Sequence, residues 1–265
     1  MFMQNEAIEW GVRSTGAPTR SRLQCGHILV ELSRGPDEIC LASKCLSDEE
    51  IREGIPAEAP VQWTNWTVCT GSHDVRLLPG LPDLPVLARQ DPVFEVPPGG
   101  EEKVFVSIPV TVFVQVNERG GEILAEFPTA ALPKVKFGEP DKAEPCFLLA
   151  DPPRKAALRD LDGAMVQAPI LIRNDSREVL RVTQICLRVA HLSIYRAGKS
   201  LWASETLVRY QGGENPSRIS VKSGVPAEAG GAALIAGPRA GGPATLVGRT
   251  FRSFRQWTRS AAHCF

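Results

Sequence analysis

Alternation of apolar and polar side chains is the clearest pattern in this sequence. Val or Ile stands at every second position from Val104 to Val116, seven residues in all. Because a period of two belongs to a β-strand and not to a helix, the pattern places these seven side chains on one face of a sheet. Pro109 interrupts the run, and since proline lacks a backbone donor it predicts an edge position or a break into two strands.

Shorter β-type runs surround this segment. They are His27–Ser33, Val61–Cys69, Ile123–Phe127, Ile170–Arg173, Val179–Val189, His191–Tyr195 and Leu201–Tyr210. The apolar positions change parity near Thr183 and Gln184, which predicts a β-bulge. Ser47–Arg52 begins with Ser and Asp followed by two acids, which is typical of a short helix start. Strands spaced by about 8–12 residues indicate a mostly β fold, and we expect an antiparallel β-sandwich of short strands rather than βαβ units.

A proline-dense passage divides the chain. Six prolines between Pro79 and Pro98 predict loops and edge strands, because proline cannot donate to a ladder. We expect residues 1–80 to form an acidic segment with strands that belongs to the same fold, and residues 85–223 to form the sandwich core. A division into two lobes near residues 80–90 is the alternative. Residues 224–245 are rich in Ala, Gly and Pro and predict an irregular linker.

The segment after this linker, residues 246–259, predicts a C-terminal basic amphipathic helix. At 100° per residue its apolar side chains fall within about 140° and its arginines on the opposite side. The predicted interaction residues are Arg249, Phe251, Arg252, Phe254, Arg255, Trp257 and Arg259. Such a helix docks on the protein body, lies on an anionic membrane surface or fills a groove of a partner protein. Docking is the commonest fate of an amphipathic helix, and the preceding linker slightly favours the last two because a docked helix rarely needs a long tether.

Charge and composition narrow the function classes. The chain has 30 basic and 30 acidic residues and a net charge of zero, which argues against a basic nucleic-acid binder. The balance is uneven, because residues 1–60 carry a charge of −4 and residues 239–265 carry five arginines and no acid. The 23 glycines and 22 prolines predict many turns and few long helices.

We expect a cytoplasmic protein. The start, Met1–Glu6, lacks the basic residues and apolar core of a signal peptide, and no apolar stretch reaches the roughly 18 residues of a membrane span. The seven cysteines form no CxxC motif, so we expect reduced structural thiols. They are Cys25, Cys40, Cys45, Cys69, Cys146, Cys186 and Cys264.

Motifs for catalysis, metals and cofactors are absent from the sequence. It contains no GxGxxG, GxxxxGK[ST], HExxH or GxSxG, so we predict no cofactor, no metal and no catalytic residue. Three weaker patterns have ordinary explanations. The acids from Glu139 to Glu144 favour a solvated turn, and His73-Asp74 favours a loop contact. The tryptophans Trp63, Trp66 and Trp202 favour a buried core over a sugar-stacking surface.

Residues 85–235 resemble the family named domain of unknown function 432 (DUF432), which is known chiefly from archaea. The stretches that carry the resemblance are Pro92–Gly99, the alternating valines, Phe127-Pro128, Lys134–Pro140, Ala168–Asn174, Ile194-Tyr195, Leu201-Trp202 and Ala229–Leu234. The resemblance implies a mostly β fold without an assigned function, and it supplies no catalytic residue.

These observations together predict a non-enzymatic binding or scaffold module, with attachment to a membrane surface through residues 246–259 as one form of it. The alternative is a carbohydrate-active or hydrolytic enzyme with a site on a sheet concavity. Paired carboxylates about 5–10 Å apart in a cleft would favour the enzyme. Single-stranded nucleic-acid binding on an OB-like barrel would require exposed aromatic residues beside a basic groove.

Overall fold

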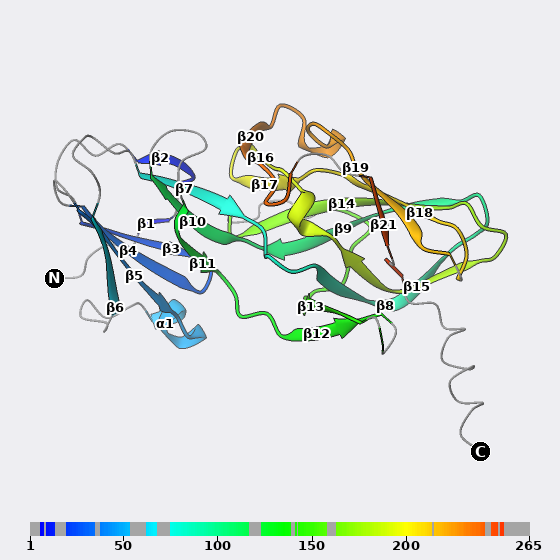
Figure 1. Cartoon of the computed structure of the whole chain (residues 1–265), viewed down its shortest axis with the longest axis horizontal. Coiled ribbons are helices and arrows are strands. Elements are labelled where there is room, and N and C mark those ends of the chain that lie inside the picture. The colour runs from blue at the N-terminus through cyan, green and yellow to red at the C-terminus, as the bar shows by residue number, and fades with distance from the viewer. Residues whose placement is uncertain are drawn as a thin grey trace, which may run out of the picture. The chain divides into compact units, whose positions relative to one another are not determined.

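A computed structural model shows mostly β-structure in the residues that it describes. The described residues are 6–7, 9–13, 20–34, 38–53, 62–67, 75–116, 123–138, 141, 143–157, 163–213, 215–241, 245–248 and 250–251. Of the described residues, strands account for 59% and helices for 7%, so the expected mostly β class is confirmed. The chain divides into two compact units (Figure 1). Unit 1 comprises Met1–Gly80 and Pro109–Ala131, and unit 2 comprises Leu81–Ile108 and Leu132–Phe265.

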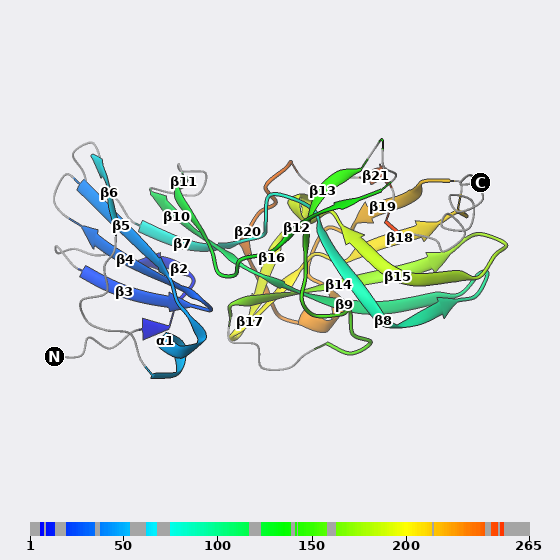
Figure 2. The same cartoon turned by 90° about the horizontal axis from the view of Figure 1, so that it is seen from below.

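Unit 1 contains a five-stranded and a four-stranded sheet. The first has the order β1 (Glu6–Ala7), β3 (Arg20–Cys25), β4 (Ile28–Arg34), β5 (Glu38–Cys45) and β6 (Gln62–Thr67), and the second has the order β11 (Ile123–Pro128), β10 (Thr111–Val116), β7 (Val75–Gly80) and β2 (Gly11–Arg13). Figure 2 shows β3 to β6 side by side. The cross-strand pairs Leu23–Val30 and Leu32–Leu41 share one buried face of the first sheet.

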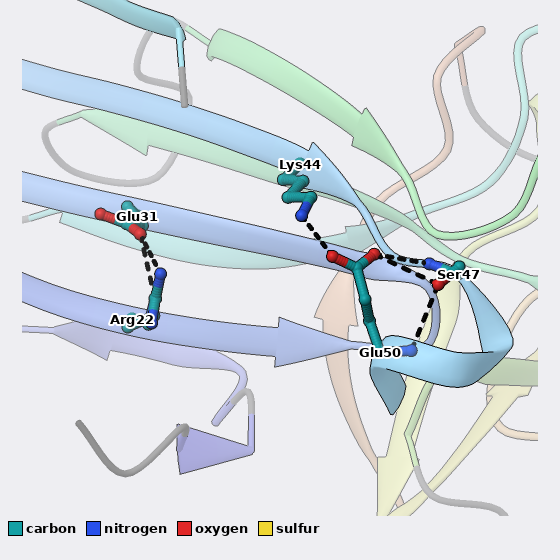
Figure 3. A network of polar contacts seen from close by, with 5 residues as sticks. All are labelled: Arg22, Glu31, Lys44, Ser47 and Glu50. Carbon is teal, nitrogen blue, oxygen red and sulfur yellow. Dashed lines mark hydrogen bonds and ion pairs between the residues drawn. The ribbon is translucent and has the colours of Figure 1, made fainter. Parts of the chain in front are cut away.

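The short helix α1 (Asp48–Glu53) follows β5, as the sequence of this segment predicts. The Glu50 amide donates a hydrogen bond to the Ser47 hydroxyl at 3.2 Å, and the Ser47 amide donates one to a Glu50 carboxylate oxygen at 3.0 Å. Lys44 also contacts this carboxylate (Figure 3). This reciprocal capping box satisfies two amides that the first helical turn leaves without intrahelical partners.

Unit 2 contains a four-stranded and an eight-stranded sheet. The first has the order β12 (Lys134–Phe137), β13 (Glu144–Leu148), β8 (Val86–Val96) and β15 (Leu180–Leu187). The second has the order β20 (Ala233–Ala236), β16 (Ile194–Ala197), β17 (Ser200–Ala203), β14 (Met165–Asn174), β18 (Thr206–Tyr210), β19 (Ser217–Val221) and β21 (Thr245–Gly248), with β9 (Glu101–Pro109) beside β14. Because β13 runs parallel to β8 and β14 runs parallel to β17 and β18, these sheets are mixed, and the expectation of a purely antiparallel fold needs correction.

The long run of alternating valines belongs to two sheets. Val110 separates β9 in unit 2 from β10 in unit 1, which confirms the break predicted at Pro109. The seven side chains therefore do not share one face of one sheet. Intervening side chains are also buried, and they are Phe105, Ser107, Thr111, Phe113 and Gln115. Both faces of this segment are covered, so its alternation marks extended backbone and not a half-exposed sheet.

The proline-dense passage contains strand β8, whose part beyond Leu87 pairs with β15 alone among the described strands, in agreement with the expectation of loops and edge strands. Strand β8 lies between β13 and β15 and includes Pro92. Its ladder with β15 pairs Phe94 with Val182 and Arg89 with Gln184, so Pro92 lies in an interval that makes no pair with β15. The missing proline donor therefore interrupts no bond of that ladder. The register shift between Val182 and Gln184 confirms the predicted bulge.

The prediction of a C-terminal amphipathic helix over residues 246–259 is wrong for residues 246–248. Residues Thr245–Gly248 form β21, in which Leu246 pairs with Ile219 and Val247 with Arg218 of β19. The reason is that an extended strand can pair with the backbone N–H and C=O groups of β19, whereas a helix cannot. Residues 252–259 lie outside the described part of the chain. Where we expected an irregular linker, Ala233–Ala236 form β20 and pair with β16.

No helix in the described part of the chain has the length and apolar character needed to cross a bilayer.

Candidate functional site

A pair of buried cysteines in unit 2 is the strongest candidate site. Glu144 and Cys146 are two residues apart on β13, so they project from the same face of that strand. Cys186 lies near the end of β15, and Arg188 follows that strand. Strands β13 and β15 lie on either side of β8 in the sheet order. The fold therefore brings together four side chains from segments about 40 residues apart in sequence.

The two thiols are in contact inside an apolar cluster. Their sulfur atoms are 3.8 Å apart, and the residues are 0% and 1% exposed. Leu87 and Phe137 complete the cluster, and Val135 and Leu148 pack against it. The Cys146 thiol also lies 3.8 Å from the backbone oxygen of Glu144. Apolar side chains therefore make up most of the surroundings of the two sulfur atoms.

A charged pair borders the thiols. The two terminal nitrogens of Arg188 donate to the two carboxylate oxygens of Glu144, each at 2.5 Å. Their side chains are 24% and 30% exposed, so the pair lies between the buried thiols and solvent. The bidentate geometry fixes the Glu144 carboxylate close to the sulfur atoms.

This arrangement shifts the pKa values of the two thiols in opposite directions. A hydrogen bond from the Cys186 thiol, assisted by the charge of Arg188, lowers the pKa of Cys146 although burial opposes this. Donating that bond, together with burial, raises the pKa of Cys186. Burial lowers the pKa of Arg188, but its bonds to Glu144 outweigh burial and raise it overall.

These side chains are also a set of metal-ligand atoms. One carboxylate oxygen of Glu144 and the sulfur atoms of Cys146 and Cys186 all lie within 4.8 Å of one another. Within the described ranges, this is the only group of three or more His, Cys, Asp or Glu side chains that close together. Sequence reasoning missed it, because the two cysteines have no motif spacing and only the fold pairs them.

One of the predicted C-terminal interaction residues, Phe251, lies near this cluster. The Cys186 amide donates to the Thr250 carbonyl at 2.9 Å, and Phe251 forms an isolated bridge with Ile185. Phe251 is 9% exposed and meets the Tyr210 ring edge-on at a centroid distance of 6.1 Å. Of the predicted set, only Phe251 is described, and it packs on unit 2. The others lie outside the described residues, and they are Arg249, Arg252, Phe254, Arg255, Trp257 and Arg259.

A second polar cluster of unit 2 surrounds Lys103. Its ammonium group donates to Glu205 at 2.6 Å and contacts Glu228 at 2.5 Å, and Lys222 also contacts Glu205. Burial raises the pKa of Glu205, but the bonds from the two lysines outweigh burial and lower it overall. Two carboxylates thus lie close together here, and both contact a lysine.

The weaker sequence patterns resolve differently. Trp202 is buried and meets Phe105 edge-on, which agrees with the core expectation, whereas Trp63 is 36% exposed. Glu144 belongs to a strand and not to a solvated turn. His73 and Asp74 lie outside the described residues, as does the side chain of Trp66.

Unit 1 has an ion pair of a different kind. Arg22 on β3 and Glu31 on β4 are directly opposed, and the arginine Nε donates to the carboxylate at 2.9 Å (Figure 3). Both residues are buried, at 6% and 3% exposure. No metal-ligand cluster accompanies this pair among the residues that the structure describes.

Comparison with known proteins assigns the chain to a family. No match was found among curated proteins, and none was found among solved structures. The model of a family described as "Protein of unknown function (DUF432)" matches residues 9–255. This match is longer than the resemblance apparent in the sequence and includes most of both units. The chain therefore belongs to the DUF432 family.

Proposed function

We propose that this protein is a non-enzymatic binding module whose C-terminal segment contacts an anionic membrane surface. The observation that carries this proposal is the charge of residues 239–265, which include five arginines and no acidic residue. Aromatic residues are interleaved with these arginines, as in segments that bind lipid headgroups at the interface. The proposal depends on this composition and does not require a helix over residues 252–259.

The attachment of Thr250 and Phe251 to unit 2 supports the proposal. Arg252, Arg255 and Arg259 follow Phe251 in the sequence, and the last of them is eight residues beyond it. A basic residue near an anionic surface contributes about 1 kcal/mol. Three such residues contribute about 3 kcal/mol, which is roughly a hundredfold in affinity.

The alternative of a hydrolytic enzyme has less support. A general acid of the glycosidase type needs a carboxyl group whose pKa is raised. In the carboxylate cluster of unit 2, Lys103 and Lys222 instead lower the pKa of Glu205. Those lysines keep the carboxylate ionised, so this cluster supports the packing of unit 2 and not acid catalysis.

Co-sedimentation with lipid vesicles tests the proposal. We expect the full chain to bind vesicles that contain phosphatidylglycerol and not vesicles of phosphatidylcholine alone. Replacing Arg252, Arg255 and Arg259 by Ser should weaken binding roughly a hundredfold, and added salt should weaken wild-type binding.

A matched control removes the same charge elsewhere. Arg177, Lys199 and Arg218 are exposed basic residues of unit 2, and their replacement by Ser should leave vesicle binding unchanged. Equal binding of the wild type to both vesicle types would contradict the proposal. An equal loss in the two triple variants would also contradict it, because the effect would then come from net charge alone.

A further inference from the structure

We propose that Cys146, Cys186 and Glu144 form a binding site for a zinc ion. The site lies entirely in unit 2 and is independent of the proposed membrane contact. Its donors are two thiol sulfurs and one carboxylate oxygen, which lie within 4.8 Å of one another. Thiolate, imidazole and carboxylate groups are the ligands that zinc takes in proteins, and thiolates select zinc over magnesium or calcium.

The distance between the sulfur atoms fits a tetrahedral site. Two thiolates bound to one zinc ion at about 2.3 Å each, at the tetrahedral angle, have their sulfur atoms about 3.8 Å apart. The Cys146 and Cys186 sulfurs are 3.8 Å apart. The separation of the sulfurs therefore matches that of two thiolates on one zinc ion. A disulfide would instead require the sulfurs to approach to about 2.05 Å.

Arg188 makes the charges of this site balance. Zinc binding deprotonates both thiols and releases two protons, so two thiolates and the Glu144 carboxylate bring three negative charges. One zinc ion and the Arg188 guanidinium bring three positive charges. Glu144 has two carboxylate oxygens, and Arg188 contacts both of them. When one oxygen turns to the ion, Arg188 keeps the other and orients the carboxylate, as partners of metal ligands commonly do.

The exposure of these residues supplies an entry path. Both cysteines are fully buried, but Glu144 and Arg188 are partly exposed at the border of the cluster. An ion reaching the sulfurs from that border meets the carboxylate first. Water completes the fourth position of the tetrahedron on the same side, because the other neighbours of the thiols are the apolar side chains of Leu87, Phe137, Val135 and Leu148.

Cobalt(II) titration of the reduced, chelator-treated full chain tests the site. We expect one equivalent to give a sulfur-to-cobalt charge-transfer band and the strong visible absorption of tetrahedral cobalt, and one equivalent of zinc to abolish both. Cys186→Ser should remove at least half of the charge-transfer intensity. Arg188→Gln should weaken zinc affinity about 10–100-fold while preserving the band, because it removes a partner of a ligand and not a ligand.

Two thiols of unit 1 supply the matched control. Cys40 is half-buried and Cys45 is exposed, so replacing both by Ser should leave the cobalt spectrum unchanged. Loss of the band in this control, or no band in the wild type, would overturn the proposal. A disulfide between Cys146 and Cys186 would also overturn it. Such a bond would make the chain 2 Da lighter in mass spectrometry and would join the tryptic peptides 143–154 and 182–188. If Cys186→Ser does not fold, the wild-type stoichiometry and peptide map still decide the question.

Discussion

Two Arg–Glu pairs, Arg22–Glu31 in unit 1 and Arg188–Glu144 in unit 2, show what separates a structural contact from a candidate site. Arg22 and Glu31 are nine residues apart, directly opposed on neighbouring strands and almost fully buried. Arg188 and Glu144 are 44 residues apart, partly exposed and adjacent to two thiols. The ion pair alone therefore does not mark function. Additional donor atoms and access to solvent distinguish the second pair.

The largest effect is expected from breaking the buried pair. Arg22→Met leaves the Glu31 carboxylate buried without its arginine, and we expect a loss of about 3–5 kcal/mol in the free energy of unfolding, measured by urea denaturation. The double variant Arg22→Met/Glu31→Leu should recover most of this loss, because no buried charge remains. Equal destabilisation by the single and double variants would show that packing, and not charge, accounts for the effect.

Acid should act on a third ionic cluster, that of Lys103 and Glu205. The pKa of Glu205 is lowered in the folded state, so its contribution to stability is present above its unfolded pKa and is lost as the pH falls through its folded pKa. Below about pH 4.5, protonation of this carboxyl lowers the free energy of unfolding by up to about 1.4 kcal/mol for each pH unit. Denaturation at a series of acidic pH values should give Glu205→Gln a shallower slope than the wild type, and identical slopes would contradict the assignment.

Breaking the partly exposed pair should cost less than breaking the buried pair. Arg188→Met removes the partner of Glu144, but solvent reaches that carboxylate, so we expect a loss of about 1 kcal/mol in urea denaturation of the metal-free chain. A loss as large as that of Arg22→Met would remove the distinction between the two pairs. The comparison uses metal-free protein because a bound ion adds its own stability.

The smallest effect is expected at the helix cap of unit 1. Ser47→Ala removes the hydroxyl that accepts the Glu50 amide and should destabilise the chain by about 0.5–1 kcal/mol. Ser47→Thr keeps a hydroxyl and should stay closer to the wild type. Urea denaturation of the two variants measures the difference, and equal stabilities for Ala and Thr would show that this cap contributes nothing.

Local patterns predicted the strands of this fold better than their assembly. The run from Ile123 and the bulge near Gln184 were predictable because a period of two and a change in parity are properties of neighbouring residues. The division of the alternating valines between two units depends on pairing partners elsewhere in the chain. The same holds for Leu246 and Val247, which fit a helical pattern but pair with the edge of β19.

The candidate site could not be predicted from local sequence patterns, because it also depends on pairing between distant segments. Cys146 and Cys186 do not have the spacing of a metal-binding motif. Each lies in a strand, where a thiol behaves as a small apolar residue. Their contact arises because β13 and β15 flank β8. Only the charged residues two positions away, Glu144 and Arg188, offered a signal. Glu144 lies on the same face of β13 as Cys146, and Arg188 directly follows the end of β15.

X-ray absorption fine structure of the zinc-loaded wild-type chain measures the proposed zinc site itself, because it counts the atoms that bind the ion. The proposed site predicts two sulfur neighbours at about 2.3 Å together with oxygen neighbours at about 2.0–2.2 Å. Zinc bound by oxygen and nitrogen alone, or by four sulfurs, would contradict the assignment of Cys146, Cys186 and Glu144 as the metal site.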